Sequence, residues 1–260
     1  MSSLHADPLG PHSDVVSTAR FLLDAKGRRT SRKFLVEGPQ NILSAVENGL
    51  ANYILALDDS EVVEFAQKSR LKVYRINEAA SKSLSDTKTP QGIYAVCEMP
   101  DLNLMEMKVK RFSIVLDRIS DPGNVGTIIR TAAAFGADSV IALAGTADVW
   151  SGKVVRSTAG AFAQVPIISG VTEEELLTWT TKNGINSLAL DGNGSTLMNS
   201  LDLQAPHIWL VGNEAGGLTD NLIHSATTSI KIPMMANVES LNAAMAVGIC
   251  AFASFTAQDK

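Results

Sequence analysis

Cysteine and histidine are scarce in this chain, which excludes the simplest metal sites. The 260 residues include two cysteines, Cys97 and Cys250, and four histidines. The histidines form no metal-ligand spacing with each other or with the cysteines. Both cysteines lie among apolar residues. We therefore expect two buried free thiols in a reducing cytoplasm, with no disulfide and no metal.

A hydrophobic run long enough to cross a membrane is also missing. The most apolar stretch, Ala243 to Phe255, is shorter than the roughly 18 residues that a span needs. Residues 1–14 are polar, contain Pro8 and Pro11, and precede no apolar run of a signal peptide. We expect a loose tail over residues 1–14, a cytoplasmic location and no membrane partner.

Net positive charge, the usual mark of a nucleic-acid partner, is lacking as well: the formal charge is −5. Basic residues are nevertheless concentrated between Arg20 and Lys33, opposed there only by Asp24. This run is either a solvated face or a set of phosphate contacts. If it binds RNA, the candidate contacts are Arg28, Arg29, Arg32 and Lys33.

Short apolar runs that alternate with helix-like segments dominate the chain after Arg111. Such alternation predicts an α/β fold, with a mostly parallel sheet that carries helices on both faces. The predicted strands are Ser113–Leu116, Ser139–Leu143, Val165–Ile168, Asn186–Leu190, Ile208–Val211 and Ser229–Ile232. The predicted helices include Val125–Phe135, Glu173–Thr181 and Leu241–Phe255.

A smaller α/β layer is predicted before this region, from the helical spacing and short apolar runs of residues 16–96. The segment 99–110, with Pro100 and mixed charge, is typical of a linker. The expected organisation is a tail at 1–14, a small domain at 15–98, the linker, and a larger domain at 111–260.

Ligands of parallel sheets bind beyond the carboxyl ends of the strands, and one such loop runs from Asp117 to Asn124. The helix that follows contains Arg130 among small apolar residues. An arginine there is expensive to bury unless it is paired. Its guanidinium either faces a phosphate or carboxylate of a ligand, or forms a structural ion pair. We expect the side chain to face the candidate site and not the solvent.

Two further loops carry glycines and polar residues at the expected edge of the sheet. The loop 212–217 begins with Gly212, which permits close backbone approach, and contains Glu214. It is not a GxGxxG fingerprint, which counts against a dinucleotide-dependent dehydrogenase. In the loop after Ile232, Ser240 and Asn242 stand where a buried helix begins. Either they cap that helix or they orient a reacting hydroxyl.

The order of these motifs closely resembles that of the SpoU (TrmH) family of RNA methyltransferases. The resemblance rests on Asn124 with Arg130, on the loop 212–217, and on the segments 232–234 and 240–242. It continues in the segments 135–137 and 153–161. Upstream, the segments 32–38 and 85–92 look like the RNA-binding domain that precedes the catalytic domain in many members.

The resemblance implies a deep trefoil knot, S-adenosylmethionine as cofactor, and a homodimer whose sites are completed across the interface. It implies transfer of a methyl group to a ribose 2′-hydroxyl of RNA. By the same resemblance, the groups that align or stabilise the reaction are Arg130, Asn124, Glu214, Ser240 and Asn242. Those that contact the cofactor are Gly212, Ile232 and Leu241, with Leu190 and Asp191 nearby.

Three functions fit the resemblance. Methylation of ribosomal RNA is favoured by the paired N-terminal domain. Methylation of transfer RNA is the alternative, although such enzymes often lack that domain or carry basic terminal extensions. A non-catalytic RNA-binding protein of the same fold is the third, and the presence of Asn124, Arg130, Glu214, Ser240 and Asn242 argues against it.

Overall fold

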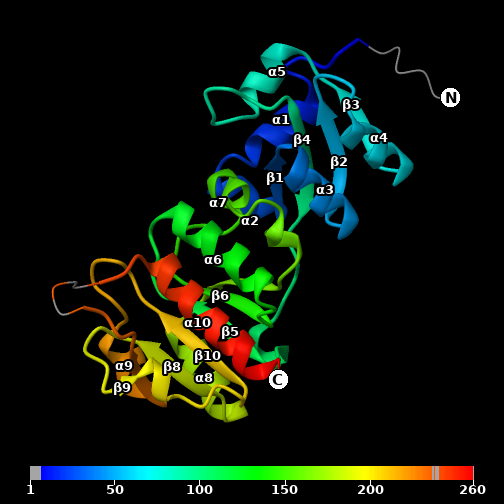
Figure 1. The fold of residues 1–260 in the computed structure, drawn as a ribbon. Helices are drawn as coiled ribbons and strands as arrows, with labels where there is room; N and C mark the ends of the chain where they lie inside the picture. Colours follow the sequence, from blue (N-terminus) through cyan, green and yellow to red (C-terminus); the bar gives the residue numbers. More distant parts are fainter. Residues whose placement is uncertain (1–6, 236, 238–239, 260) are drawn as a thin grey trace. The chain divides into compact units, whose positions relative to one another are not determined.

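The computed structural model describes residues 7–235, 237 and 240–259, and Figure 1 shows their elements. The chain divides into two compact units. The N-terminal unit comprises residues 1–100 and 150–164, and the C-terminal unit comprises residues 101–149 and 165–260. The chain therefore passes from one unit to the other three times. The segment 150–164, expected within the larger domain, is part of the N-terminal unit.

A four-stranded sheet in the order β1-β4-β2-β3 forms the centre of the N-terminal unit. The β1–β4 and β4–β2 pairs are antiparallel, and the β2–β3 pair is parallel. The strands are β1 (Lys33–Glu37), β2 (Ala51–Ala56), β3 (Lys72–Arg75) and β4 (Ile93–Glu98). The helices are α1 (Asp14–Phe21), α2 (Ala25–Ser31), α3 (Pro39–Glu47), α4 (Glu61–Lys68), α5 (Glu78–Ser83) and α7 (Gly152–Ser157), with a 3-10 turn η2 (Ala161–Ala163).

The amino end of the described chain is held by the N-terminal unit. Leu9 N donates a hydrogen bond to the carbonyl of Arg75 at 2.8 Å, and Asn77 N donates to the carbonyl of Leu9 at 3.1 Å. Leu9 also packs against the buried cluster that contains Leu35. The first six residues of the expected tail lie outside the described residues, but Leu9 is anchored by backbone pairing.

Buried aromatic rings attach the segment 150–164 to the sheet of the N-terminal unit. The centroid of the Phe34 ring on β1 lies 4.7 Å from that of Trp150 and 5.6 Å from that of Phe162. All three side chains are at most 5% exposed. Ser44 on α3 donates a buried hydrogen bond of 2.7 Å to the carbonyl of Gly160. The segment thus completes a core begun by residues more than one hundred positions earlier.

A buried carboxylate makes the polar attachment of the same segment. Glu37 is 4% exposed and lies 3.2 Å from the guanidinium of Arg156 on α7. Its oxygens also accept hydrogen bonds from the Ser85 hydroxyl and the Gln91 backbone amide. Arg156 forms a second ion pair with Asp86 at 2.6 Å. A buried charge needs this density of partners.

A seven-stranded sheet in the order β7-β6-β5-β10-β8-β11-β9, parallel at every pairing, forms the C-terminal unit. The strands are β5 (Phe112–Leu116), β6 (Ser139–Leu143), β7 (Ile167–Val171), β8 (Asn186–Leu190), β9 (Thr196–Leu197), β10 (His207–Val211) and β11 (Thr228–Lys231). The helices are α6 (Pro122–Ala134), α8 (Glu173–Asn183), α9 (Asp220–Ser225) and α10 (Ala243–Gln258), with 3-10 turns η1 (Leu104–Glu106) and η3 (Met198–Ser200).

Alternation along β10 shows that helices cover both faces of this sheet. Ile208 and Leu210 join the cluster that contains Trp179 of α8 and Leu222 of α9. Trp209 points to the opposite face, where its indole donates to the Ser254 hydroxyl of α10 at 2.9 Å. The predicted α/β class with helices on both faces is therefore confirmed. No helix among the described residues is long and apolar enough to cross a membrane.

The two cysteines are both free and buried, as predicted. Burial raises the pKa of the Cys97 and Cys250 thiols. Each thiol is thus held in its neutral, unreactive form.

Candidate functional site

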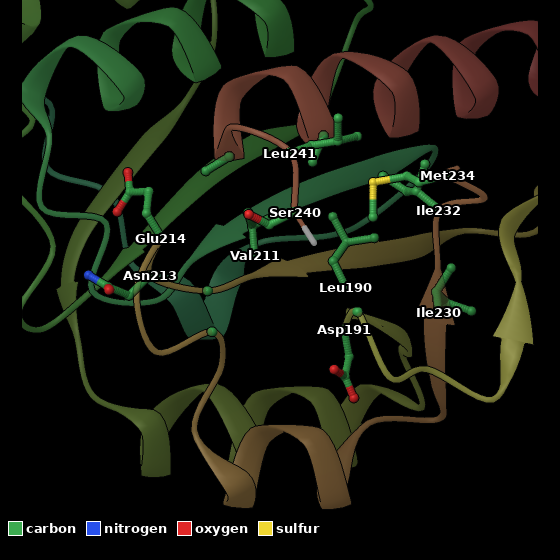
Figure 2. Close-up of a pocket in the computed structure, with 15 residues that line it drawn as sticks. Leu190, Asp191, Val211, Asn213, Glu214, Ile230, Ile232, Met234, Ser240 and Leu241 are labelled. Atoms are coloured by element: carbon green, nitrogen blue, oxygen red, sulfur yellow. The ribbon is translucent and has the colours of Figure 1, made fainter. Parts of the chain in front are cut away.

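Three loops at the carboxyl ends of β8, β10 and β11 enclose a pocket of about 240 Å³ in the C-terminal unit (Figure 2). Leu190 ends β8 and Val211 ends β10, and both line the pocket. The third wall is the segment after β11 together with the start of α10. This is the edge of a parallel sheet at which ligands bind. It brings together Leu190, Asp191, Gly212, Glu214, Ile232, Ser240 and Leu241 of the predicted site.

The lining of the pocket is apolar with two carboxylates. Leu190, Ile232 and Leu241 supply apolar side chains, whereas Asp191 and Glu214 supply negative charge. No lysine or arginine is among the described residues that line it. Nucleotides with phosphate groups need such cations or an amide cradle. The apolar side chains and the negative charge of this lining fit a cationic nucleoside such as S-adenosylmethionine.

Gly212 is the first residue of the loop 212–217, which forms one wall of the pocket. A Cβ atom at this position would lie 2.1 Å from the carbonyl carbon of Gly217, so only glycine fits. The loop closes on itself, since Asn213 N donates to Gly217 O at 3.1 Å and Gly217 N donates to Asn213 O at 2.8 Å. Gly217 itself has φ +64°. The tight turn brings the backbone of Gly212 and Gly217 to the pocket, beside the side chains of Asn213 and Glu214.

A chain of hydrogen bonds connects α10, α6 and the loop 212–217, called the glycine loop below. Asn242 caps α10, with its Oδ1 accepting from Ala244 N at 2.9 Å and Met245 N at 3.2 Å. Its Nδ2 donates to Asn124 Oδ1 at 3.0 Å, and Asn124 Nδ2 donates to Glu214 Oε1 at 2.7 Å. The helix amides fix the orientation of both asparagines, since every donor then meets an acceptor. Asn242 therefore both caps the helix and orients the pocket side chains, while Ser240 lines the pocket.

Arg130 is exposed on α6 and makes no hydrogen bond or ion pair to any described residue of its own chain. Its helix neighbours Ile128, Ile129 and Ala132 are buried, so Arg130 lies outside the buried stripe of α6. This corrects the expectation of an arginine held among apolar residues and away from solvent. The structural ion pair that the sequence left open is not formed within the described chain either.

The candidate RNA-binding residues of the N-terminal unit differ in their environment. Arg28 is 5% exposed, and its guanidinium donates to the carbonyls of Leu22 and Leu23 at 2.8 and 2.7 Å. This corrects its assignment as a phosphate contact, because Arg28 satisfies the carboxyl end of α1. Lys33 is partly exposed and paired with Glu98 at 3.2 Å. Arg29 and Arg32 are exposed.

Several lining residues were not singled out from the sequence. Asn213 and Met234 lie on the two loops, while Ala243 and Ala246 lie on the first turn of α10. For Asn213 and Met234 the available signal was their place in loops after predicted strands. Their side-chain direction depends on tertiary packing. No group of three or more His, Cys, Asp or Glu residues within the described part of the chain could hold a metal ion.

Comparison with known proteins agrees with this geometry. Residues 111–252 match the model of the SpoU rRNA Methylase family, and residues 14–95 match the MRM3-like substrate binding domain. The fold and the pocket are those of a methyltransferase that uses S-adenosylmethionine. The chain belongs to the SpoU rRNA methylase family.

Relatives with names and structures cover nearly the whole chain. The 23S rRNA (guanosine(2553)-2'-O)-methyltransferase RlmP of Bacillus subtilis is 30% identical over 87% of this chain and 90% of its own length. An AdoMet-bound rRNA methyltransferase from Sinorhizobium meliloti is 29% identical, with a TM-score of 0.84 over 98% of this chain and 96% of that one. AviRb from Streptomyces viridochromogenes, in complex with AdoMet, is 27% identical, with a TM-score of 0.86 over 94% of this chain and 98% of that one.

Proposed function

We propose that this chain transfers the methyl group of S-adenosylmethionine to a ribose 2′-hydroxyl of ribosomal RNA. The observation that carries the proposal is the pocket at the carboxyl ends of β8, β10 and β11. Two of its walls are motif segments, the loop 212–217 and the residues after β11, and the third is the loop after β8. Two relatives, RlmP and the 23S rRNA (uridine(2479)-2'-O)-methyltransferase of Streptomyces viridochromogenes, are named as ribosomal RNA methyltransferases. These names favour ribosomal RNA over transfer RNA as the substrate. The N-terminal substrate-binding domain supports the same choice.

The cofactor would be held by Gly212, Ile232 and Leu241, with Leu190 and Asp191 beside it. When bound, S-adenosylmethionine supplies a methyl group that is already activated by its sulfonium charge. The chain therefore has to align the acceptor hydroxyl and assist removal of its proton. Its own residues must also keep water from the pocket, which the apolar lining favours.

The polar residues at the pocket mouth would provide that alignment. Asn124 is locked between Asn242 and Glu214, so its orientation is set before RNA arrives. Ser240 lies at the same mouth and can donate to or accept from the hydroxyl. Arg130 would hold the ribose-phosphate and stabilise developing negative charge. A guanidinium stays protonated, so it is a poor proton acceptor.

A homodimer would complete the site. Arg130 is exposed in the single chain, and α10 exposes Met245, Ile249 and Phe252 to 63%, 39% and 55%. These side chains are spaced four and three residues apart, so they share one helix face. Large apolar groups gathered on one face are typical of an interface. Light scattering on the purified chain would give its mass in solution, and a monomer at micromolar concentration would contradict this arrangement.

RNA contacts are assigned to Arg29, Arg32 and Lys33, with the larger share falling on the exposed pair Arg29 and Arg32. A cytoplasmic location is part of this proposal, since the relative RlmP is a ribosomal RNA methyltransferase of a bacterium. The trefoil knot expected from the family depends on the path of residues 232–242. Part of that segment lies outside the described residues, and the knot stays a prediction.

Methylation of a total RNA pool with labelled methyl donor, followed by mapping of the product, tests the function directly. The expected result is one labelled ribose in large-subunit RNA. Label in transfer RNA would establish the alternative substrate, and no label with any RNA would favour a non-catalytic binding protein. Calorimetric titration with S-adenosylmethionine in the presence of a chelator tests the cofactor separately. Binding that disappears with chelator would contradict a metal-free site.

A further inference from the structure

Arg118, directly after β5, has a backbone conformation that is rare for arginine. Its φ is +54°, in the left-handed region that favours glycine. No other residue of the loop from Asp117 to Asn124 has a positive φ. Such a conformation persists only where surrounding contacts stabilise it.

The side chain of Arg118 turns back onto the preceding residue. Its Nε donates to Asp117 Oδ1 at 3.0 Å, and its Nη2 donates to Asp117 Oδ2 at 2.9 Å. Asp117 is buried, with its side chain 4% exposed, whereas the Arg118 side chain is 44% exposed. The hydrogen bonds from the guanidinium, and then its charge pairing with Asp117, raise the pKa of Arg118. The left-handed backbone of Arg118 thus occurs together with a two-pronged pairing to the preceding residue.

The same two residues hold the glycine loop and its flanks at four further points. The backbone of Asp117 donates to Val211 O at 2.8 Å, and its Oδ2 accepts from Thr219 N at 3.2 Å. Arg118 Nη2 donates to Gly217 O at 3.2 Å, and Arg118 O accepts from Asn213 Nδ2 at 2.7 Å.

Asn213 and Gly217 are hydrogen-bonded to Arg118, and both residues line the pocket together with Glu214 between them. The position of this wall of the pocket therefore depends on the contacts of Asp117 and Arg118. Neither Asp117 nor Arg118 lines the pocket itself. We infer that Asp117 and Arg118 are positioning residues, which hold the loop 212–217 in the conformation that binds S-adenosylmethionine. The inference rests on the proposed function.

The test is cofactor binding and kinetics of the full chain carrying Arg118→Ala, Arg118→Gly or Arg118→Lys. Arg118→Ala removes the two-pronged guanidinium, called the fork below, and keeps a residue with a Cβ. Arg118→Gly also removes the fork, and it relieves the backbone strain of the left-handed conformation. Arg70 is an exposed arginine of similar conformation, with φ +63°, in the N-terminal unit. Arg70→Gly is therefore the matched control for the backbone change.

Calorimetry with S-adenosylmethionine and S-adenosylhomocysteine should give a Kd raised roughly tenfold to a hundredfold by both Arg118→Ala and Arg118→Gly. Arg118→Lys should restore little, because a point charge cannot reproduce the fork. Arg70→Gly should leave both Kd values unchanged. In steady state, the KM for S-adenosylmethionine should rise while the KM for RNA stays constant, a split that loss of stability alone does not produce. The value of kcat at saturating cofactor should change by less than about threefold.

Asp117→Asn should also raise the Kd. It should lower the Tm as well, because Asp117 is buried. Three outcomes would overturn the inference. If the wild-type chain binds the cofactor and Kd is unchanged in both Arg118→Ala and Arg118→Gly, the inference is refuted while the proposed function stands. Normal binding in Arg118→Gly but not in Arg118→Ala would assign the effect to backbone conformation. A wild-type chain that binds neither ligand would refute the proposed function together with the inference.

Discussion

Arg28 and Arg156 in the N-terminal unit and Arg130 in the C-terminal unit show two opposite uses of a guanidinium. Arg28 is buried against backbone carbonyls, and Arg156 is mostly buried against Glu37 and Asp86. Arg130 is exposed, with no partner among the described residues of its chain. The sequence indicated the reverse for Arg28 and Arg130. The paired arginines therefore serve the fold of their unit, and the unpaired one is available to a ligand or a second chain.

Arg130→Ala should give the largest effect that this contrast predicts. Loss of one charge-assisted contact from a transition state costs on the order of 3–4 kcal/mol, so single-turnover methyl transfer should fall roughly a hundredfold to a thousandfold. The Tm and the cofactor Kd should stay near wild type, because the side chain has no partner in its own chain. Arg130→Lys should not rescue transfer. Full activity in a stable Arg130→Ala protein would remove Arg130 from the mechanism.

Arg156→Ala should mainly destabilise the protein. It leaves the buried Glu37 carboxylate without its cation, at a cost of roughly 2–4 kcal/mol in the free energy of unfolding. Lys68, which pairs with Glu64 at 3.8 Å on the exposed face of α4, provides the control. Lys68→Ala should cost less than about 0.5 kcal/mol. Denaturant titration measures both, and equal stability of the two variants would contradict the structural role of Arg156.

Neutralising Arg29 and Arg32 should weaken RNA binding without altering cofactor affinity. Each lost phosphate contact should lower the slope of log K against log salt by roughly one unit. Arg28→Ala is the informative comparison, since it should lower the Tm through Leu22 and Leu23 while leaving the salt slope unchanged. If the slope is the same in all variants, the exposed arginines are only a solvated face.

The smallest predicted effect is on the pH dependence of stability and comes from His207, an imidazole that the C-terminal unit buries in its neutral form. Burial lowers the pKa of His207, whose Nδ1 lies 2.8 Å from Ala205 O and whose Nε2 lies 2.8 Å from Ser254 Oγ. The carbonyl can only accept, so Nδ1 carries the proton and the Ser254 hydroxyl donates to Nε2.

Because the unfolded chain binds a proton near pH 6.5 and the folded chain only at lower pH, stability should fall as the pH drops below about 6.5. Above that pH His207 is neutral in both states and contributes no pH dependence. Denaturant titration between pH 7 and pH 5 measures this loss. His207→Gln should flatten the profile, whereas replacement of the exposed His224 should not. An unchanged profile in His207→Gln would exclude His207 as the source.

The sheet of the C-terminal unit was predictable because its strands are nearly continuous apolar runs. The predicted Ser139–Leu143 and Asn186–Leu190 coincide with β6 and β8. The two-residue β9 was missed, since such a strand has no periodicity of its own. The order of the strands was not predicted either, because it depends on pairings such as β5 with β10, which lie far apart in sequence.

The pocket was predictable as a set of loops and not as a set of contacts. Glycine at position 212 and polar residues at 240 and 242 are local signals. The hydrogen bond from Asn242 to Asn124 joins residues 118 positions apart, and no local pattern specifies it. The exposure of Arg130 was missed for a similar reason. Apolar neighbours in sequence suggested burial, whereas the turn of α6 decides which side chains face the core.

The insertion of residues 150–164 into the N-terminal unit bears on how the chain folds during synthesis. Domains usually fold in order as they leave the ribosome. Phe34 on β1, however, packs on Trp150 and Phe162, which are translated more than one hundred residues later. By then β5 and β6 of the other unit have already been made. The N-terminal unit can therefore acquire its complete core only after the first two strands of its neighbour have been translated, and it can do so before the other five have been.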